Sequence, residues 1–231
     1  MQLSDIKSFS PEIILIFGSI FILVYGIFFT KSKDLNKNIF YITFVSLILS
    51  FYFSIYVVDL GTNSFNNLLN NDLYTLFFKI LAFTGTIIIT YISYNYLKDL
   101  DILKPEFFFL ILISLTGILI LISSRNIISM YLSLELQSIC LYILAAYRKY
   151  DIKSSESGVK YFIIGSLASG ILLYGLSIIY AFTNATDFYE ISKSINLSLE
   201  NNENFLILNL GFVLILCGLF FKIAIVPFHM W

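Results

Sequence analysis

Residues 127–147 read IISMYLSLELQSICLYILAAY, a nearly continuous apolar run that contains one charged side chain, Glu135. A helix needs about 20 predominantly apolar residues to cross the roughly 30 Å of hydrocarbon in a bilayer. This run is long enough to do so, and ordinary soluble domains seldom contain one. We therefore expect a transmembrane helix here, with a carboxylate close to its centre.

The composition of the whole chain places it in the same class. Its 231 residues are 58% hydrophobic and only 13% charged, and the mean hydropathy is +0.88. A net charge of −1 offers no attraction for a polyanion, so nucleic acid is not an expected partner. The sequence contains no phosphate-binding glycine fingerprint, metal-ligand cluster or nucleophile–base set, which argues against a free-standing enzyme. Cys140 and Cys217 lie in apolar runs and are expected to be packing residues.

Seven apolar runs of membrane-spanning length can be marked off between polar stretches. Backbone groups in lipid must be satisfied within the segment, and the period-two alternation of barrel strands is absent. We therefore expect an all-α, polytopic transmembrane bundle of about seven spans, forming a single membrane domain over residues 1–231. The expected spans are residues 11–29, 39–58, 73–97, 106–123, 127–147, 159–182 and 205–227.

Lysine and arginine residues are unevenly distributed between the two sides of this bundle. Eight follow the first, third and fifth spans, whereas three lie on the opposite side. The positive-inside rule then predicts an N-terminus on the outer face. The longest polar stretch, residues 183–204, also falls on the outer side, and we expect a solvated loop with one short interfacial helix there. The eight are Lys31, Lys33, Lys37, Lys98, Lys104, Arg148, Lys149 and Lys153, and the three are Lys7, Arg125 and Lys193.

Glu135 is the clearest candidate for a functional group. A charge at the centre of a span costs about 2.5–3.5 kcal/mol on insertion scales, so it requires a reason. Tyr131, Ser138 and Tyr142 recur at helical spacing around it and form one polar-capable stripe that should face the bundle interior. The alternative is a purely structural, protonated Glu135 that is hydrogen-bonded to a neighbouring helix.

Lys222 lies late in the seventh span, beside an expected helix break. Pro227 has no N–H and clashes with the carbonyl four residues before it, so the helix should break or kink near Ile223. Interrupted helices line hydrated cavities in transporters. His229, the only histidine in the chain, follows the break and titrates near physiological pH, so it is a candidate proton relay.

Two further lysines lie near the ends of their spans. Lys79 follows the start of the third span by six residues, and we expect its long side chain to extend to the headgroup region. Lys160 lies near the start of the sixth span. Glu156 precedes Lys160 by one helical turn, close enough for an interfacial ion pair.

Three long motifs carry a resemblance to a known family. They are YLSLELQSICLYILAAY at residues 131–147, SSESGVKYFIIGSLASGILLYG at residues 154–175 and FKIAIVPFHMW at residues 221–231. In this order they resemble subunit 2 of the proton-pumping NADH:ubiquinone oxidoreductase, respiratory complex I, which is called the N subunit in bacteria. The resemblance runs from about residue 121 onward. The first three spans agree with this family only in number and hydropathy.

The resemblance implies an antiporter-like half with a broken seventh helix and assigns roles within a proton path. It implies that Glu135 pairs with Lys222, that Lys160 belongs to the path through its VKYF motif, and that His229 belongs to the broken-helix motif PFHMW. It also implies three N-terminal helices over residues 11–105 and the first part of the antiporter-like repeat, the fourth to seventh helices, over residues 106–231.

The same resemblance implies partners and cofactors. Members of this family continue with further helices after the seventh, so the sequence is either a fragment or part of a split subunit whose second polypeptide supplies them, and we favour the split subunit. Other membrane-arm subunits and the lipid bilayer would be the remaining partners. FMN, iron–sulfur clusters and ubiquinone would lie in other subunits, with no cofactor or metal in this chain.

The leading functional hypothesis is a proton-translocating, non-redox subunit of NADH:ubiquinone reductase. One alternative is a subunit of a multisubunit sodium/proton antiporter, and another is a structural scaffold without an active channel. Abundant Phe, Tyr, Ile and Asn are typical of AT-rich codons. We therefore expect the mitochondrial inner membrane, rather than a bacterial inner membrane, with the N-terminus on the intermembrane-space side.

Overall fold

The computed structural model describes residues 3–29, 35–56, 61–65, 68–200 and 205–226, and within these ranges the chain is mostly helical. The elements are α1 (Leu3–Ser8), α2 (Ser10–Phe28), α3 (Leu35–Tyr56), β1 (Thr62–Ser64), β2 (Leu69–Asn71), α4 (Leu73–Asp99), α5 (Pro105–Ser123), α6 (Ile127–Ala145), α7 (Ile152–Thr183), α8 (Phe188–Glu200) and α9 (Phe205–Ile223).

Seven of the described helices are long and apolar enough to cross a bilayer, namely α2, α3, α4, α5, α6, α7 and α9. Each coincides with one of the seven predicted runs, so the predicted all-α transmembrane bundle is confirmed. The short helix α8 lies within the polar stretch where one interfacial helix was expected. The hairpin formed by β1 and β2 was not predicted; its strands are antiparallel, with Ser64 opposite Leu69.

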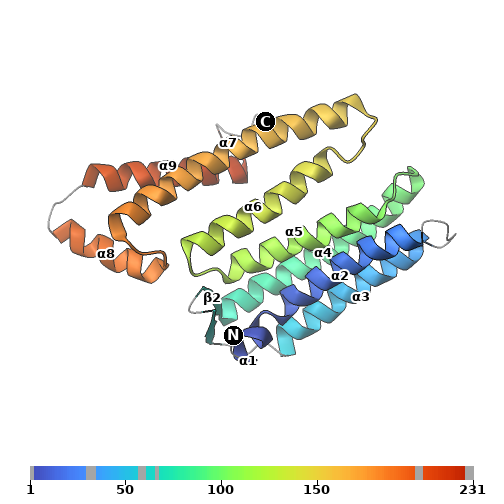
Figure 1. The fold of residues 1–231 in the computed structure, drawn as a ribbon, viewed down its shortest axis with the longest axis horizontal. Helices are drawn as coiled ribbons and strands as arrows, with labels where there is room; N and C mark the ends of the chain where they lie inside the picture. The colour runs from blue at the N-terminus through green and yellow to red at the C-terminus, as the bar shows by residue number, and fades with distance from the viewer. Residues whose placement is uncertain (1–2, 30–34, 57–60, 66–67, 201–204, 227–231) are drawn as a thin grey trace.

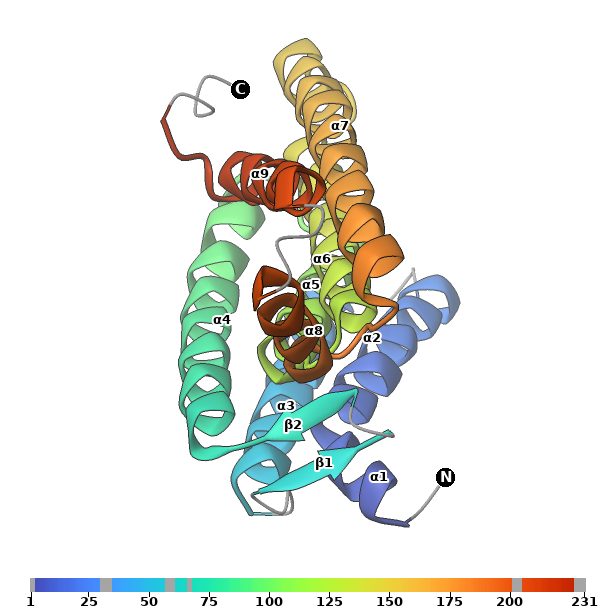
Figure 2. The same ribbon diagram turned by 90° about the vertical axis from the view of Figure 1, so that its left-hand side faces the viewer.

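The spanning helices lie in two groups (Figure 1). Helices α2, α3, α4 and α5 form the first group, and α6, α7 and α9 form the second, which adjoins the first where α6 packs against α5. Figure 2 shows α1 and the hairpin together at one end of the molecule. We call this the hairpin end; it also contains residues 124–126 and 184–188. The opposite end, with residues 100–104 and 146–151, is the basic end.

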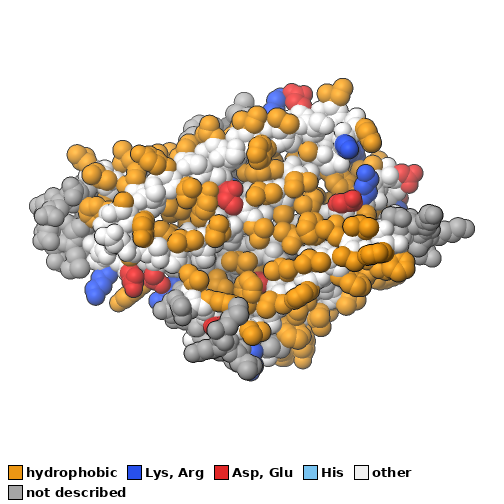
Figure 3. All heavy atoms as spheres, in the orientation of Figure 1, with side chains coloured by type: hydrophobic (Ala, Val, Ile, Leu, Met, Phe, Trp, Pro, Cys, Tyr) orange, Lys and Arg blue, Asp and Glu red, His pale blue; other side chains and the backbone are white. Residues whose placement is uncertain are grey.

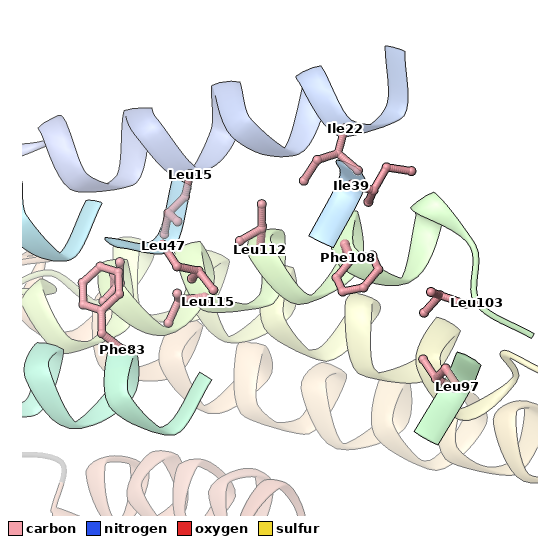
Figure 4. Close-up of a cluster of buried hydrophobic side chains, with 11 residues drawn as sticks. Leu15, Ile22, Ile39, Leu47, Phe83, Leu97, Leu103, Phe108, Leu112 and Leu115 are labelled. Atoms are coloured by element: carbon pink, nitrogen blue, oxygen red, sulfur yellow. The ribbon is translucent and has the colours of Figure 1, made fainter. Parts of the chain in front are cut away.

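Apolar side chains from all four helices fill the core of the first group (Figure 4). Leu15, Leu47, Phe83 and Leu112 are fully buried there. The predicted division between residues 105 and 106 falls at the start of α5, whose side chains nevertheless share this core with α2, α3 and α4. In lipid, such helices associate mainly through close van der Waals packing.

The outer surface is also largely apolar, as lipid contact requires. Large side chains such as Phe17 and Ile27 are exposed on α2. On the face shown in Figure 3, hydrophobic side chains cover the middle of the molecule, and most charged side chains lie toward its two ends. This distribution matches a bilayer whose headgroups meet the two ends of the bundle.

Helix α7 begins at Ile152, well before the predicted start at residue 159. The carboxylate of Asp151 accepts a hydrogen bond from the Lys153 N–H at 3.0 Å and so caps the helix. The first turns are polar, which is why an apolar run alone places the start too late. With 32 residues, α7 is about 48 Å long and extends beyond the hydrocarbon at the basic end.

Main-chain hydrogen bonds connect the loop between α5 and α6 to two neighbouring segments at the hairpin end. The Arg125 N–H donates to the Leu68 carbonyl at 3.0 Å, and the Ile127 N–H donates to the Thr186 carbonyl at 2.9 Å. The Arg125 guanidinium also forms an ion pair with Asp187 at 3.4 Å. The start of α6 is thus attached both to the hairpin and to the segment between α7 and α8.

Helices α7 and α9 approach each other closely because Gly175 lacks a side chain. A Cβ atom at Gly175 would lie 2.8 Å from the Ile215 backbone nitrogen and 2.9 Å from the Gly211 carbonyl oxygen. These neighbours are backbone atoms, so a larger residue would have to push the helices apart. Small residues commonly permit such contacts between membrane helices.

We predict that Gly175→Ala weakens the packing of α9 on α7, at a cost of about 1–3 kcal/mol for an overpacked contact. The measurement is the thermal unfolding midpoint of the purified protein in detergent. Gly170→Ala on the same helix is the matched control, because a Cβ atom there would meet nothing within 4 Å. Equal midpoints for the two variants would contradict the close contact.

Candidate functional site

The side chain of Lys222, near the end of α9, contacts Glu135 and Ser138 of α6. The Lys222 ammonium donates a hydrogen bond to the Ser138 hydroxyl at 2.7 Å, and its nitrogen lies 3.4 Å from Oε1 of Glu135. The latter distance is that of an ion pair rather than of an optimal hydrogen bond. The side chains are 13% exposed for Lys222 and 24% exposed for Glu135. The structure therefore brings together two residues that are 87 positions apart in the sequence.

The depth of this pair follows from the two helices that carry it. Eight residues, or about 12 Å of helix rise, separate Glu135 from the first residue of α6. Lys222 shares a small cavity with Gly165 and Ala168 of α7. These residues follow the start of α7 by 13 and 16 positions, or about 20–24 Å. The ion pair is therefore far from the basic end.

Helix α9 stops beside Lys222, where the sequence predicts a break. Its last residue is Ile223, and Ala224 takes a left-handed conformation with φ 56°. The N–H groups of Ala224 and Ile225 turn back to the carbonyls of Phe221 and Phe220, at 3.2 and 3.0 Å. This arrangement is a Schellman C-cap, in which glycine is the usual left-handed residue. Lys222 consequently lies in the last helical turn, where the negative end of the helix dipole stabilises a cation.

Part of the polar stripe predicted around Glu135 is packed against α7 and α9. Ser138 and Tyr142 are buried, and the Ser138 hydroxyl both accepts from Lys222 and donates to the Leu134 carbonyl at 2.6 Å. Tyr142 packs edge-on against Tyr161 of α7, with ring centroids 4.7 Å apart. Tyr131, one turn before Glu135, is only half-buried.

Lys160 is not brought into this cluster. It forms an ion pair with Glu156 at 2.5 Å, one helical turn away on α7, and both side chains are more than half exposed. The pair lies toward the basic end rather than beside Glu135. His229 and Pro227, the other sequence-derived candidates around the break, lie outside the described residues.

The expectation that Lys79 extends to the headgroups is wrong. Lys79 is only 3% exposed, and its ammonium donates to the Glu12 carboxylate at 2.9 Å. Lys79 lies on α4 and Glu12 on α2, so the pair connects two helices of the first group. The side chain is turned inward because a buried carboxylate offers it a partner, which a periodicity argument on α4 alone does not reveal.

Sequence reasoning alone does not single out Glu12, which is the main residue it misses. Its side chain is 2% exposed. The available signal is an acidic residue just inside an apolar run, after Pro11. Nearby, the Ser50 hydroxyl of α3 donates to the Pro11 carbonyl at 2.8 Å. Polar groups of α2, α3 and α4 therefore gather near the hairpin end of the first group.

No cluster of three or more metal-ligating side chains occurs among the described residues. The thiol of Cys140 is buried and that of Cys217 is partly buried, and both are free. The chemistry offered by the described part of the chain is that of ion pairs and hydroxyl groups.

The C-terminal part of the chain matches a known family model. The match covers residues 124–231, and the model is described as "NADH:quinone oxidoreductase/Mrp antiporter, TM". Among curated proteins, NADH-quinone oxidoreductase subunit N 1 of Thermodesulfovibrio yellowstonii is 37% identical over 227 residues, covering 98% of this chain and 47% of the relative. Subunit N of Bartonella bacilliformis is 38% identical over 225 residues, covering 96% of this chain and 44% of the relative. The chain thus spans about half the length of these curated relatives.

Solved structures give a concordant result. A chain of respiratory complex I from Thermus thermophilus with bound aureothin superposes with a TM-score of 0.72 at 25% identity, covering 96% of this chain and 45% of that chain. A chain of the membrane-bound sulfane sulfur reductase, an archaeal respiratory membrane complex, gives a TM-score of 0.73 at 17% identity, covering 100% of this chain and 47% of that chain. The second likeness concerns the fold alone.

The buried pair between α2 and α4 leads to a stability prediction. Glu12→Gln and Lys79→Met should each destabilise the protein by about 3–5 kcal/mol, because each leaves a buried group without its partner. The double variant should lose less than the sum of the two single losses. Thermal unfolding in detergent measures all three.

Glu156→Gln with Lys160→Met provides the control for this cycle, because that pair is exposed and its loss should leave the unfolding midpoint unchanged. Strictly additive losses for Glu12 and Lys79 would contradict a coupled pair.

Proposed function

The chain belongs to the family of the N subunit of NADH-quinone oxidoreductase, and on this basis we propose that it forms part of a proton-translocating module in the membrane arm of such a complex. The observation that carries the proposal is the ion pair between Glu135 and Lys222 beside the end of α9. The subunit N relatives have names that place them in NADH-quinone oxidoreductases. In this proposal the chain takes part in the complex's activity without carrying out a redox step.

The proposed mechanism uses two states of the ion pair. With Glu135 close, the ammonium of Lys222 is stabilised by the carboxylate, by Ser138 and by the end of the α9 dipole. When the carboxylate moves away, the ammonium loses its countercharge in a poorly solvated site and releases its proton. When the carboxylate returns, it favours reprotonation of Lys222. Each cycle therefore exchanges one proton at Nζ.

The magnitudes are compatible with this cycle. At an effective dielectric constant of ~20, two unit charges 3.4 Å apart attract each other by about 5 kcal/mol. Moving one charge against ~150 mV costs about 3.5 kcal/mol. Separating the pair can therefore change the free energy of proton binding to Lys222 by at least as much as it costs to move one charge across the membrane.

Lys160 and His229 are further proposed members of the path. The ion pair of Lys160 with Glu156 is exposed toward the basic end, where it can exchange protons with water. The role of His229 rests on its motif alone. FMN, iron–sulfur clusters and ubiquinone are proposed to lie in other subunits, whose redox chemistry drives the separation of the pair.

The rest of an antiporter-like channel is proposed to come from polypeptide beyond residues 1–231, either in the same chain or in a second one, with residues 106–231 forming the first part of the repeat. Other membrane-arm subunits complete the assembly. Intact-complex mass spectrometry is the test. Chains that co-assemble with this one should include helices homologous to the second half of the subunit N relatives. Recovery of this chain alone would favour a scaffold role.

A sodium/proton antiporter subunit is the second candidate, because the description of the matching family model includes the Mrp antiporter. Absorbance of flavin and iron–sulfur clusters in the native assembly distinguishes the two, since only the oxidoreductase needs them. Sodium-dependent proton exchange without such absorbance would favour the antiporter.

The orientation, with the N-terminus on the outer or intermembrane-space side, and a mitochondrial rather than bacterial inner membrane remain proposals that rest on loop charge and composition. We predict that a cysteine placed at Lys193 reacts with a membrane-impermeant maleimide applied from outside, and that one placed at Lys149 does not. Cys140→Ser and Cys217→Ser remove the native thiols. The opposite labelling pattern would reverse the orientation. Labelling in isolated mitochondria or in bacterial spheroplasts would also identify the membrane.

We predict that Glu135→Gln and Lys222→Met each lower the number of protons pumped per electron several-fold in the assembled complex, because neither variant retains the ion pair. Quinone reduction and proton release should be recorded in parallel. Glu190→Gln and Lys193→Met on the exposed surface of α8 are the matched controls. Unchanged pumping per electron in both site variants would refute the proposed function.

A further inference from the structure

A small cavity lies against Lys222 on the side away from the hairpin end. Its volume is about 20 Å³, and its walls include Tyr142 of α6, Tyr161 and Gly165 of α7, and Lys222 of α9. A cavity needs roughly 10–15 Å³ of such volume, together with two to four polar partners, to hold one water molecule. This space therefore has room for a single water.

The chemistry of the walls suits a water molecule. An ammonium group has three N–H donors, and the contacts of Lys222 with Glu135 and Ser138 use two of them. Among the described residues this ammonium has no further hydrogen-bond partner, so its third N–H can donate to an acceptor in the cavity. The phenols of Tyr142 and Tyr161 each provide a hydroxyl that can both donate and accept.

Gly165 places the Tyr142 hydroxyl at the cavity. A Cβ atom on Gly165 would lie within van der Waals overlap of the Tyr142 hydroxyl oxygen, at 2.1 Å. The hydroxyl thus occupies the space beside the glycine that lines the same cavity. Tyr142 follows Ser138 by one helical turn on α6, so the polar groups continue in order from Ser138 toward the basic end.

The polar groups continue along α7 beyond the cavity. Ser157 precedes Tyr161 by four residues and so lies on the same helix face, one turn nearer to the basic end. Its hydroxyl donates to the Ser154 carbonyl at 2.8 Å. Both serines line an open pocket of about 440 Å³ at the basic end, together with Arg148, Asp151 and Lys153. Such an open, charged pocket is accessible to water.

We propose that the 20 Å³ cavity holds one ordered water, and that Tyr142, Tyr161 and this water form a proton relay that connects Lys222 with the open pocket at Ser157. The proposal rests on the proposed function and assigns the route on one side of Lys222. Lys222 passes a proton to the water, which passes one of its own protons to the Tyr142 hydroxyl. Tyr142 passes its original proton to the Tyr161 hydroxyl, and Tyr161 releases its own toward Ser157 and the pocket. The water and both tyrosines end with their starting number of protons, and Lys222 is left as a neutral amine until it is reprotonated.

The relay can be tested by removing single hydroxyl groups in the assembled complex. Tyr142→Phe and Tyr161→Phe should each slow proton pumping several-fold and increase the deuterium isotope effect on pumping, because they leave both rings in place. Tyr174→Phe is the matched control, since Tyr174 is an exposed residue of α7. A native gel shows whether each variant assembles, and a lesion confined to packing would not alter the isotope effect of the assembled complex.

The outcomes separate this proposal from the proposed function. If Glu135→Gln and Lys222→Met lower pumping per electron several-fold while both tyrosine variants pump with unchanged rate and isotope effect, the relay is overturned and the proposed function stands. If all four pump normally, both are overturned. A high-resolution map of the wild-type complex provides a test that needs no variant. It should show a water about 3 Å from Nζ of Lys222, and the absence of that density would overturn the relay.

Discussion

An α-helix that ends between the two faces of a bilayer leaves carbonyl groups in a medium that offers them no water. Helix α9 meets this constraint with its own chain, because the N–H groups of Ala224 and Ile225 satisfy the carbonyls of Phe221 and Phe220. The remaining negative end of the helix then faces an ammonium in the same turn. A cation at this depth thus has three sources of stabilisation, namely the helix end, Ser138 and Glu135.

The two ion pairs described above that connect different helices differ in a way that suits different tasks. The pair of Glu12 with Lys79 is almost completely buried at 2.9 Å, so breaking it would expose two charges to a non-polar interior. The pair of Glu135 with Lys222 is longer, at 3.4 Å, and partly exposed, so its members can separate at lower cost. The first pair is suited to holding helices together. The second is suited to the separation of charges that the proposed proton transfer requires.

The sequence was sufficient for the features that depend on one helix at a time. Apolar length gave all seven spans, and Pro227 indicated the end of α9 near Ile223. It was insufficient where a neighbouring helix decides the outcome. Lys79 turns inward because Glu12 lies on a different helix, and α7 starts early because a side-chain cap, rather than hydropathy, sets its first turn. The hairpin escapes prediction because its strands are only three residues long.

The loop between α5 and α6 has a consequence for how the charged groups can move. Hydrogen bonds from Arg125 to the hairpin and from Ile127 to the segment after α7 fix the point where α6 enters the membrane. Helix α9 is likewise held, because it packs closely against α7 around Gly175. Neither backbone has to shift for the charges to separate, since Glu135 can leave Lys222 by rotation of its own side chain. The proposed exchange is therefore a torsional event of one flexible carboxylate between two fixed helices.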